Sequence, residues 1–257
     1  MDPQIQFHAP GWDDQLLADL AGSGSRRNDV SIENSLAISG NTVYFANSGG
    51  LVQGWDISGV EQGEDPTRVF RFWTGDDTDA SIVIDAEGML YVASERERAS
   101  SHARSDEVGQ LMKLDPSKPE DPLVWSIKDP ASDPPQGECE ESACFGFWGT
   151  PAISDGVLYA ATNHGRFFGA SMATGEILWE KELPGPTWQS PVVVDDTLIM
   201  GDCSGVLHAY DVADPQADPP ELWTVELSGC IESTPAVFGG RIFVGTRGGS
   251  FYAIGDA

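Results

Sequence analysis

A pattern of four short strands, repeated along most of the chain, is the feature that most constrains how these 257 residues can fold. The clearest copy covers residues 149–185, where short apolar stretches alternate with turns that contain glycine, aspartate or asparagine. A meander of four strands cannot bury both of its faces alone, so copies of it have to stack side by side. The other copies cover residues 34–75, 79–130, 189–229 and 233–257.

The copies share a period and a set of fixed positions. Their first strands begin at Ser35, Ala80, Thr150, Ser190 and Thr234. A small residue recurs in the second strand, at Ala46, Ala93, Ala161, Gly201 and Gly245. A large aromatic residue recurs in the fourth strand, at Phe70, Trp125, Trp179 and Trp223. A period near 40–45 residues with four strands per repeat is typical of a β-propeller. We therefore predict an all-β, five-bladed propeller of four-stranded antiparallel blades, which forms a single domain over residues 1–257.

The last copy ends after its third strand, and the N-terminal segment offers a replacement for the fourth. Residues 5–11 read Ile-Gln-Phe-His-Ala-Pro-Gly, with the same alternation and closing glycine as residues 223–229. We therefore predict that residues 4–9 form the closing strand of the last blade. Such a strand would complete the ring and remove an open sheet edge.

Three insertions, at residues 12–34, 95–108 and 129–148, are expected on one face of the propeller, which we call the top face. This face carries the connections between blades and the turns between second and third strands. Within the first insertion we predict a helix over residues 13–21, with Asp13 or Asp14 as its N-cap. The loops at 56–66, 115–122 and 211–220 are rich in aspartate and proline and read as solvated turns. Binding groups usually lie on elaborated loops of a rigid scaffold, which favours the top face.

The net charge of the chain limits the classes of molecule that it can bind. Fourteen Lys and Arg residues against 41 Asp and Glu residues give a net charge of −27, which repels nucleic acid and anionic lipid. This charge indicates a solvated surface, with a saline or calcium-rich environment as the alternative. The sequence contains no apolar run long enough to span a membrane. Its first residues have neither the basic nor the apolar region of a signal peptide.

All four cysteines map to top-face loops. Cys139 and Cys144 share one loop, whereas Cys203 and Cys230 follow the second and fourth strands of the same repeat. This arrangement indicates two disulfides and an exported protein. The longer bridge would contribute about 3–4 kcal/mol by the loop-entropy model. A zinc site is the weaker alternative, because no histidine lies within a few residues of these cysteines.

The repeat resembles that of the quinoprotein (PQQ-like) propeller family. The resemblance rests on the segment GASMATGEILW at residues 169–179, which GWD (54–56), KLD (113–115) and AYD (209–211) echo. In that family the fourth-strand tryptophan packs between blades, which implies a structural role for Trp125, Trp179 and Trp223. The dehydrogenase branch has eight blades and often an adjacent cysteine pair over the quinone, which this sequence lacks. The resemblance therefore implies the non-enzymatic branch, such as the propeller lipoprotein of the outer-membrane assembly machine, and no bound PQQ.

The starts of the inner strands and the turns after the second strands are expected to converge on the top face. The ligand-binding candidates there are Glu33, Asn34, Asp79, Trp148, Asn163, His164, Trp188, Gln189, Asp202, Glu232 and Arg247. Two tryptophans beside carboxylates suit a sugar, whereas the carboxylates alone suit a calcium ion, a glycosidase pair or simple solvation. His208 reads as a packed position in a third strand, and we assign no catalytic residue.

Two classes of function follow. The favoured one is a non-catalytic, exported propeller, extracellular or periplasmic and monomeric, that binds a protein or a carbohydrate through its top face. The alternative is an enzyme: a glycan-active hydrolase with carboxylates in the top funnel or, less favoured, a quinone-dependent dehydrogenase.

Overall fold

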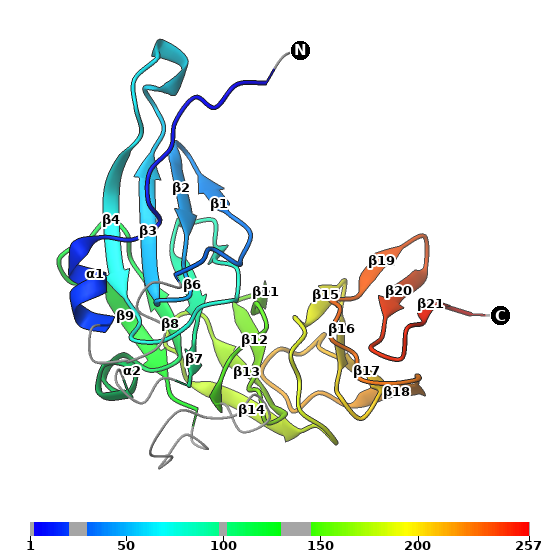
Figure 1. The fold of residues 1–257 in the computed structure, drawn as a ribbon. Helices are drawn as coiled ribbons and strands as arrows, with labels where there is room; N and C mark the ends of the chain where they lie inside the picture. Colours follow the sequence, from blue (N-terminus) through cyan, green and yellow to red (C-terminus); the bar gives the residue numbers. More distant parts are fainter. Residues whose placement is uncertain (1–2, 21–29, 98–101, 130–144, 257) are drawn as a thin grey trace.

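The computed structural model describes residues 3–20, 30–97, 102–129 and 145–256, and Figure 1 shows its sheets side by side along an arc. We call these sheets blades 1 to 5. Blade 1 contains β1 (Ala37–Ser39), β2 (Thr42–Phe45), β3 (Leu51–Asp56) and β4 (Thr67–Trp73). Blade 2 contains β5 (Val83–Ile84), β6 (Leu90–Ala93), β8 (Leu111–Leu114) and β9 (Leu123–Ile127). The all-β prediction is confirmed.

The remaining blades follow the same antiparallel order. Blade 3 contains β11 (Ala152–Ser154), β12 (Val157–Ala161), β13 (Arg166–Ser171) and β14 (Ile177–Glu182). Blade 4 contains β15 (Val192–Val194), β16 (Thr197–Gly201), β17 (Val206–Asp211) and β18 (Glu221–Glu226). Blade 5 contains three strands, β19 (Ala236–Phe238), β20 (Arg241–Gly245) and β21 (Phe251–Ile254).

The repeated sequence positions have repeated geometry. In each of blades 1 to 4 the fourth-strand aromatic residue stands opposite the third strand just before a register shift, as at Gly54/Phe70 and Gly169/Trp179. A β-bulge at this point bends the outer strand and increases its twist. The blades therefore share a curvature that lets each one stack on the next.

Most of the apolar burial lies between neighbouring blades. The four large clusters of buried side chains join blades 1 and 2, 2 and 3, 3 and 4, and 4 and 5. Hydrogen bonds between the inner strands add to three of these contacts. Ser35 N donates to Ser81 Oγ at 3.0 Å, Ser81 N to Thr150 Oγ1 at 2.9 Å, and Thr150 N to Ser190 Oγ at 2.9 Å. Each serine or threonine at the start of a blade thus binds the backbone of the blade before it.

The first insertion forms the predicted helix, shortened to α1 (Asp14–Asp19). Asp13 is its N-cap, because its Oδ1 accepts a hydrogen bond from Leu16 N at 2.8 Å. The same carboxylate binds Arg71 Nε at 2.8 Å, and this bond is the main reason that the pKa of Asp13 falls to about 2. Leu16 and Leu20 pack on Leu51 of β3, so the insertion covers part of blade 1.

Segments expected to be irregular loops contain regular structure. Within residues 95–108 lie β7 (Glu95–Arg96) and α2 (His102–Val108), and within residues 129–148 lies β10 (Phe145–Gly146). Strands β7 and β10 pair with each other. None of the described helices is long and apolar enough to cross a membrane.

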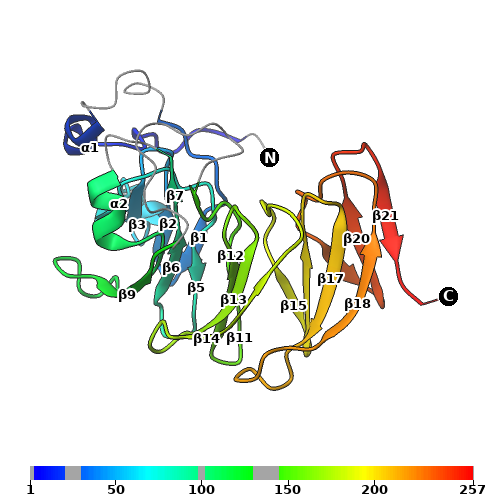
Figure 2. The same ribbon diagram turned by 90° about the horizontal axis from the view of Figure 1, so that it is seen from below.

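The predicted closing strand is absent from this structure. Residues 3–10 form no strand, and among the described strands β21 pairs only with β20. Phe7 instead contacts Trp55 of β3, with ring centroids 5.8 Å apart, and lines an apolar pocket with Val43 and Phe45 of blade 1. The two ends of the arc lie apart in Figures 1 and 2. A closed five-bladed ring therefore stays a prediction.

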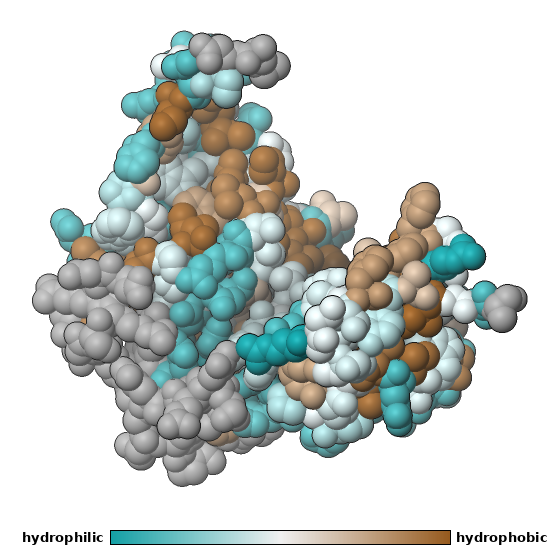
Figure 3. All heavy atoms as spheres, turned by 45° about the vertical axis from the view of Figure 1, so that its right-hand side comes forward, coloured by the Kyte–Doolittle hydropathy of each residue, from teal (hydrophilic) through white to brown (hydrophobic). Residues whose placement is uncertain are grey.

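The outer face of blade 5 is apolar and exposed. Phe238 is 82% exposed and Phe251 is 75% exposed, and apolar side chains reach the surface of the right-hand lobe in Figure 3. In the four inter-blade clusters the equivalent faces are covered by the next sheet. Blade 5 has no such neighbour among the described residues.

Substitutions at Trp179 and at its neighbour Gly169 test the packing between blades. Trp179 is 6% exposed, and a Cβ at Gly169 would lie 2.6 Å from its ring. We expect Trp179→Ala to lower the free energy of unfolding by about 3–5 kcal/mol, because it leaves a cavity in the core. Gly169→Ala should cost about 1–3 kcal/mol through overpacking. Urea denaturation measures both, with the half-buried Trp223→Ala as a milder control; equal losses for Trp179→Ala and Trp223→Ala would contradict this account.

Candidate functional site

Loops from blades 3, 4 and 5 bring two tryptophans and an arginine together on the top face. Trp148 precedes β11 and Trp188 precedes β15, and their rings stack at a centroid distance of 5.1 Å and an interplanar angle of 29°. Arg247, in the turn between β20 and β21, lies over Trp188 with its guanidinium carbon 5.6 Å from the ring centroid. We call Trp148, Trp188, Arg247 and Glu232 the aromatic surface.

Polar contacts hold the aromatic surface in place. Trp188 Nε1 donates to Asn163 Oδ1, which lies in the turn between β12 and β13. Arg247 Nε binds Glu232 Oε1 at 3.1 Å. Both tryptophans are half-buried, whereas 60% of the Arg247 side chain is exposed. His164 is exposed beside them and packs on Phe145, with ring centroids 4.6 Å apart.

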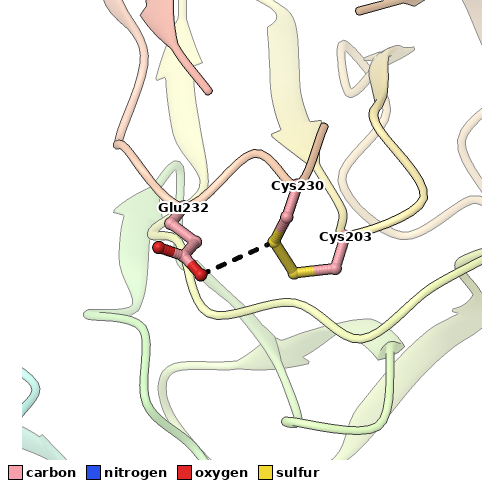
Figure 4. Close-up of side chains that lie close together, drawn as sticks. All are labelled: Cys203, Cys230 and Glu232. Atoms are coloured by element: carbon pink, nitrogen blue, oxygen red, sulfur yellow. Dashed lines mark hydrogen bonds between the residues drawn. A yellow bond between two sulfur atoms is a disulfide. The ribbon is translucent and has the colours of Figure 1, made fainter. Parts of the chain in front are cut away.

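The predicted Cys203–Cys230 disulfide is present and borders this surface (Figure 4). It links the turn between β16 and β17 to the connection between blades 4 and 5. Glu232 Oε1 lies 3.7 Å from Cys230 Sγ. A bridged sulfur carries no hydrogen and is not a thiolate ligand, so this contact is neither a hydrogen bond nor a metal site. The predicted Cys139–Cys144 pair lies outside the described residues.

Asp202 belongs to a buried charged cluster beneath the surface rather than to its rim. Its side chain is fully buried, and its Oδ2 lies 3.2 Å from His208 Nε2. The other ring nitrogen of His208 lies 3.0 Å from Glu221 Oε1 on β18. His208 is buried, as predicted, whereas its two ionic partners could not be read from the repeat pattern.

Two other predicted ligand residues, Asn34 and Gln189, bind the backbone in this structure. Asn34 Nδ2 donates to the carbonyl of Thr78 at 2.8 Å, and Gln189 Nε2 donates to that of Gly201 at 3.3 Å. Both residues are almost fully buried and join segments of backbone. These bonds stabilise the inner strands, while the buried Oε1 of Gln189 has no hydrogen-bond partner among the described residues.

The predicted carboxylates divide into separate groups. Glu232 pairs with Arg247, and Glu33 accepts a hydrogen bond from Ser31 Oγ. Asp79 groups with Asp77 and Glu95, whose carboxylate oxygens all lie within 4.8 Å of one another. We missed Glu95 because it follows β6 inside a segment read as a loop. The sequence feature that could have identified Glu95 is its position two residues after the small residue Ala93, near the top-face end of the second strand.

Burial and neighbouring charge act together on Glu95. Only 4% of the residue is exposed. Desolvation is the main cause that raises the pKa of Glu95 well above 4.5, followed by repulsion from Asp77 and Asp79. A buried carboxyl with this environment favours the protonated form. Calcium is the other group that such a trio of carboxylates suits.

Replacement of Glu95 tests this environment. Because its folded pKa is raised, stability should fall as pH rises from about 4.5 through the folded pKa. We expect Glu95→Gln to melt at a higher temperature than the parent at about pH 8, and the difference to shrink towards about pH 5. The exposed Glu120→Gln is the control and should show no such trend. Two results would contradict a protonated Glu95. One is a Glu95→Gln variant that is less stable than the parent at every pH, and the other is a calcium-dependent rise in melting temperature that only the parent shows.

Removal of the bridge tests its contribution. The bridged residues are 27 positions apart. We expect the Cys203→Ser/Cys230→Ser double variant to lose about 3–4 kcal/mol of unfolding free energy, because the unfolded chain is no longer constrained. Denaturant titration measures the loss, and reductant should bring the parent to the same midpoint. A parent whose midpoint does not change on verified reduction would show that the bridge adds no stability.

The comparisons with known proteins agree with this fold. Residues 109–218 match the family model described as outer membrane protein assembly factor BamB. The structure of BamB from Moraxella catarrhalis is 17% identical, with a TM-score of 0.61 over 88% of this chain and 59% of that one. Quinohemoprotein alcohol dehydrogenase from Comamonas testosteroni is 13% identical, with a TM-score of 0.62 over 88% of this chain and 41% of that one. No curated protein matches the sequence.

At these identities the two structures share a fold with this chain, and the chain spans less than two thirds of the length of either. The match to the family model lies on the second, third and fourth copies of the repeat and agrees with the resemblance found in GASMATGEILW. Residues 109–218 therefore resemble the BamB family model, and the fold of the described residues resembles that of BamB.

Proposed function

We propose that this protein is a non-catalytic binding module that docks a protein partner on the aromatic surface of its top face. The observation that carries the proposal is the stack of Trp148, Trp188 and Arg247, presented by loops of three successive blades. Tryptophan and arginine are the residues most enriched at energetic hot spots of protein interfaces. The disulfide and the Arg247–Glu232 pair hold the loops, which lowers the entropy cost of binding.

The geometry favours a protein over a carbohydrate. A sugar ring stacks on a free aromatic face, but Trp148 covers one part of Trp188 and the Arg247 guanidinium covers another. The exposed guanidinium instead offers hydrogen-bond donors to a carboxylate or a backbone carbonyl. BamB, which shares the fold, is described as an outer membrane protein assembly factor, and this description agrees with a protein-binding role.

The enzymatic alternatives have less support. A glycosidase needs two carboxyl groups facing one reaction centre about 5–9.5 Å apart. Glu232 is paired with Arg247, Glu33 with Ser31, and Asp79 lies in a group with Asp77 and Glu95. The sequence also lacks the adjacent cysteines often found over the quinone of related dehydrogenases, so we propose that PQQ is not a cofactor.

We place the protein in an oxidising compartment, outside the cell or in the periplasm. The Cys203–Cys230 bridge supports this location, since disulfides persist where thiols are not kept reduced. We also propose that the protein is a monomer.

Selection of peptides from a displayed library on the immobilised protein tests the proposal. We expect selected peptides to lose at least about tenfold in affinity on Arg247→Ala or Trp188→Ala, because both changes remove hot-spot contacts. Arg241→Ala, at the start of β20, and Trp12→Ala are the matched controls and should bind like the parent. Isothermal titration gives the dissociation constants, and circular dichroism checks that each variant is folded.

Two results would contradict the proposal. Peptides that bind both folded top-face variants as tightly as the parent would place the interface elsewhere. Variants of Trp148 and Trp188 that unfold would show these tryptophans to be core residues. A glycan array on the same variants decides the carbohydrate alternative.

A further inference from the structure

Blade 4 holds an ionic cluster of buried His208 and Asp202 with the half-exposed Glu221, and the proposed binding does not use it. His208 on β17 is 5% exposed and stands between the carboxylates of Asp202 and Glu221. The carboxylate of Asp202 also accepts hydrogen bonds from Ser204 N at 2.7 Å and Ser204 Oγ at 2.5 Å. These bonds close the turn between β16 and β17 around one buried charge.

That turn is attached to both sides of the aromatic surface. Cys203 N donates to the carbonyl of Pro186 at 2.8 Å, two residues before Trp188. Ile231 N donates to the carbonyl of Asp202 at 3.0 Å, one residue before Glu232. The Cys203–Cys230 bridge also joins this turn to the connection between blades 4 and 5. Arg247 N donates to the carbonyl of Cys230 in that connection at 2.8 Å. The turn therefore sets the relative positions of Trp188, Glu232 and Arg247.

The groups around His208 favour its charged form. Burial lowers the pKa of His208, but the hydrogen bonds to Asp202 and Glu221 outweigh burial, so the pKa lies above the ordinary 6.5. The Tyr210 ring stacks on the imidazole of His208, with centroids 6.0 Å apart. The ammonium of Lys181, on β14, lies 5.7 Å from the centroid of the Tyr210 ring. Burial alone would raise the pKa of Asp202. The hydrogen bonds from His208 and Ser204 outweigh burial, so the pKa of Asp202 lies below its ordinary value.

We propose that protonated His208 holds the turn at Asp202 in place, so that the aromatic surface is ordered at acidic to neutral pH and loosens when His208 loses its proton. This inference concerns regulation of the proposed binding surface and rests on that proposed function. A neutral imidazole has one N–H for two carboxylates, and it leaves the buried charge of Asp202 without a compensating cation. The contacts are complete below about pH 6.5 and are lost as pH rises through the folded pKa.

Circular dichroism measures the order of the surface without a partner, because two stacked indoles give an exciton couplet. We expect the couplet of the parent to be constant at low pH and to shrink as pH rises above about 6.5, through the raised pKa of His208. Trp148→Phe should remove the couplet and so assigns it. His208→Gln should give a small couplet that does not change with pH, since it has no proton to lose in this range.

Two further variants keep the test decisive if His208→Gln fails to fold. Glu221→Gln removes one of the groups that raise the pKa of His208, so the midpoint should move to lower pH. His164→Gln, an exposed histidine that contacts Phe145, is the control and should titrate like the parent. A parent couplet that does not change with pH, or an unchanged midpoint in Glu221→Gln, would overturn the inference. Either result leaves the peptide-binding test untouched, because that test compares affinities at one pH.

Discussion

The packing of each blade against the next is the interaction on which the rest of this structure depends. A single four-stranded sheet of this size has two faces and too few residues to cover either of them. Four inter-blade clusters of aromatic and aliphatic side chains cover the facing surfaces of adjacent sheets. Because these clusters fill the spaces between blades, the sheets hold a fixed order and the loops at their ends keep fixed positions.

The top surface follows from how closely neighbouring linkers approach. A Cβ on Gly149 would lie 2.3 Å from the carbonyl oxygen of Gln189, so only glycine lets the two linkers pass at this distance. That approach is what brings Trp148 and Trp188, each one residue before these positions, into a stack. The same argument applies at Gly248, where a Cβ would lie 2.1 Å from the carbonyl oxygen of Ser228. The turn that carries Arg247 can therefore sit against the linker that leaves blade 4.

The sequence was informative wherever a period was involved. The repeat predicted the strands and the pairing of Cys203 with Cys230, because both depend only on position within a repeat. It also placed Trp148, Trp188, Glu232 and Arg247 on one face. The stacking of Arg247 on Trp188 and the grouping of Asp79 with Glu95 depend on side-chain directions, for which a strand-level pattern has no information. The closing strand stays a prediction, because an alternating apolar segment fits any exposed apolar face, and here Phe7 contacts Trp55 of blade 1.

Shared architecture alone does not choose between the two kinds of relative. BamB and the quinohemoprotein dehydrogenase match this chain with TM-scores of 0.61 and 0.62, a difference too small to favour either function. Function has to be argued from the site, since one fold can serve unrelated activities. On the top face Arg247 pairs with Glu232 and Trp188 Nε1 donates to Asn163, whereas the buried Nε1 of Trp148 has no hydrogen-bond partner among the described residues. A half-buried aromatic stack held by a hydrogen bond and an ion pair is a feature that protein interfaces share, so the proposed binding function rests on this surface and not on the shared fold.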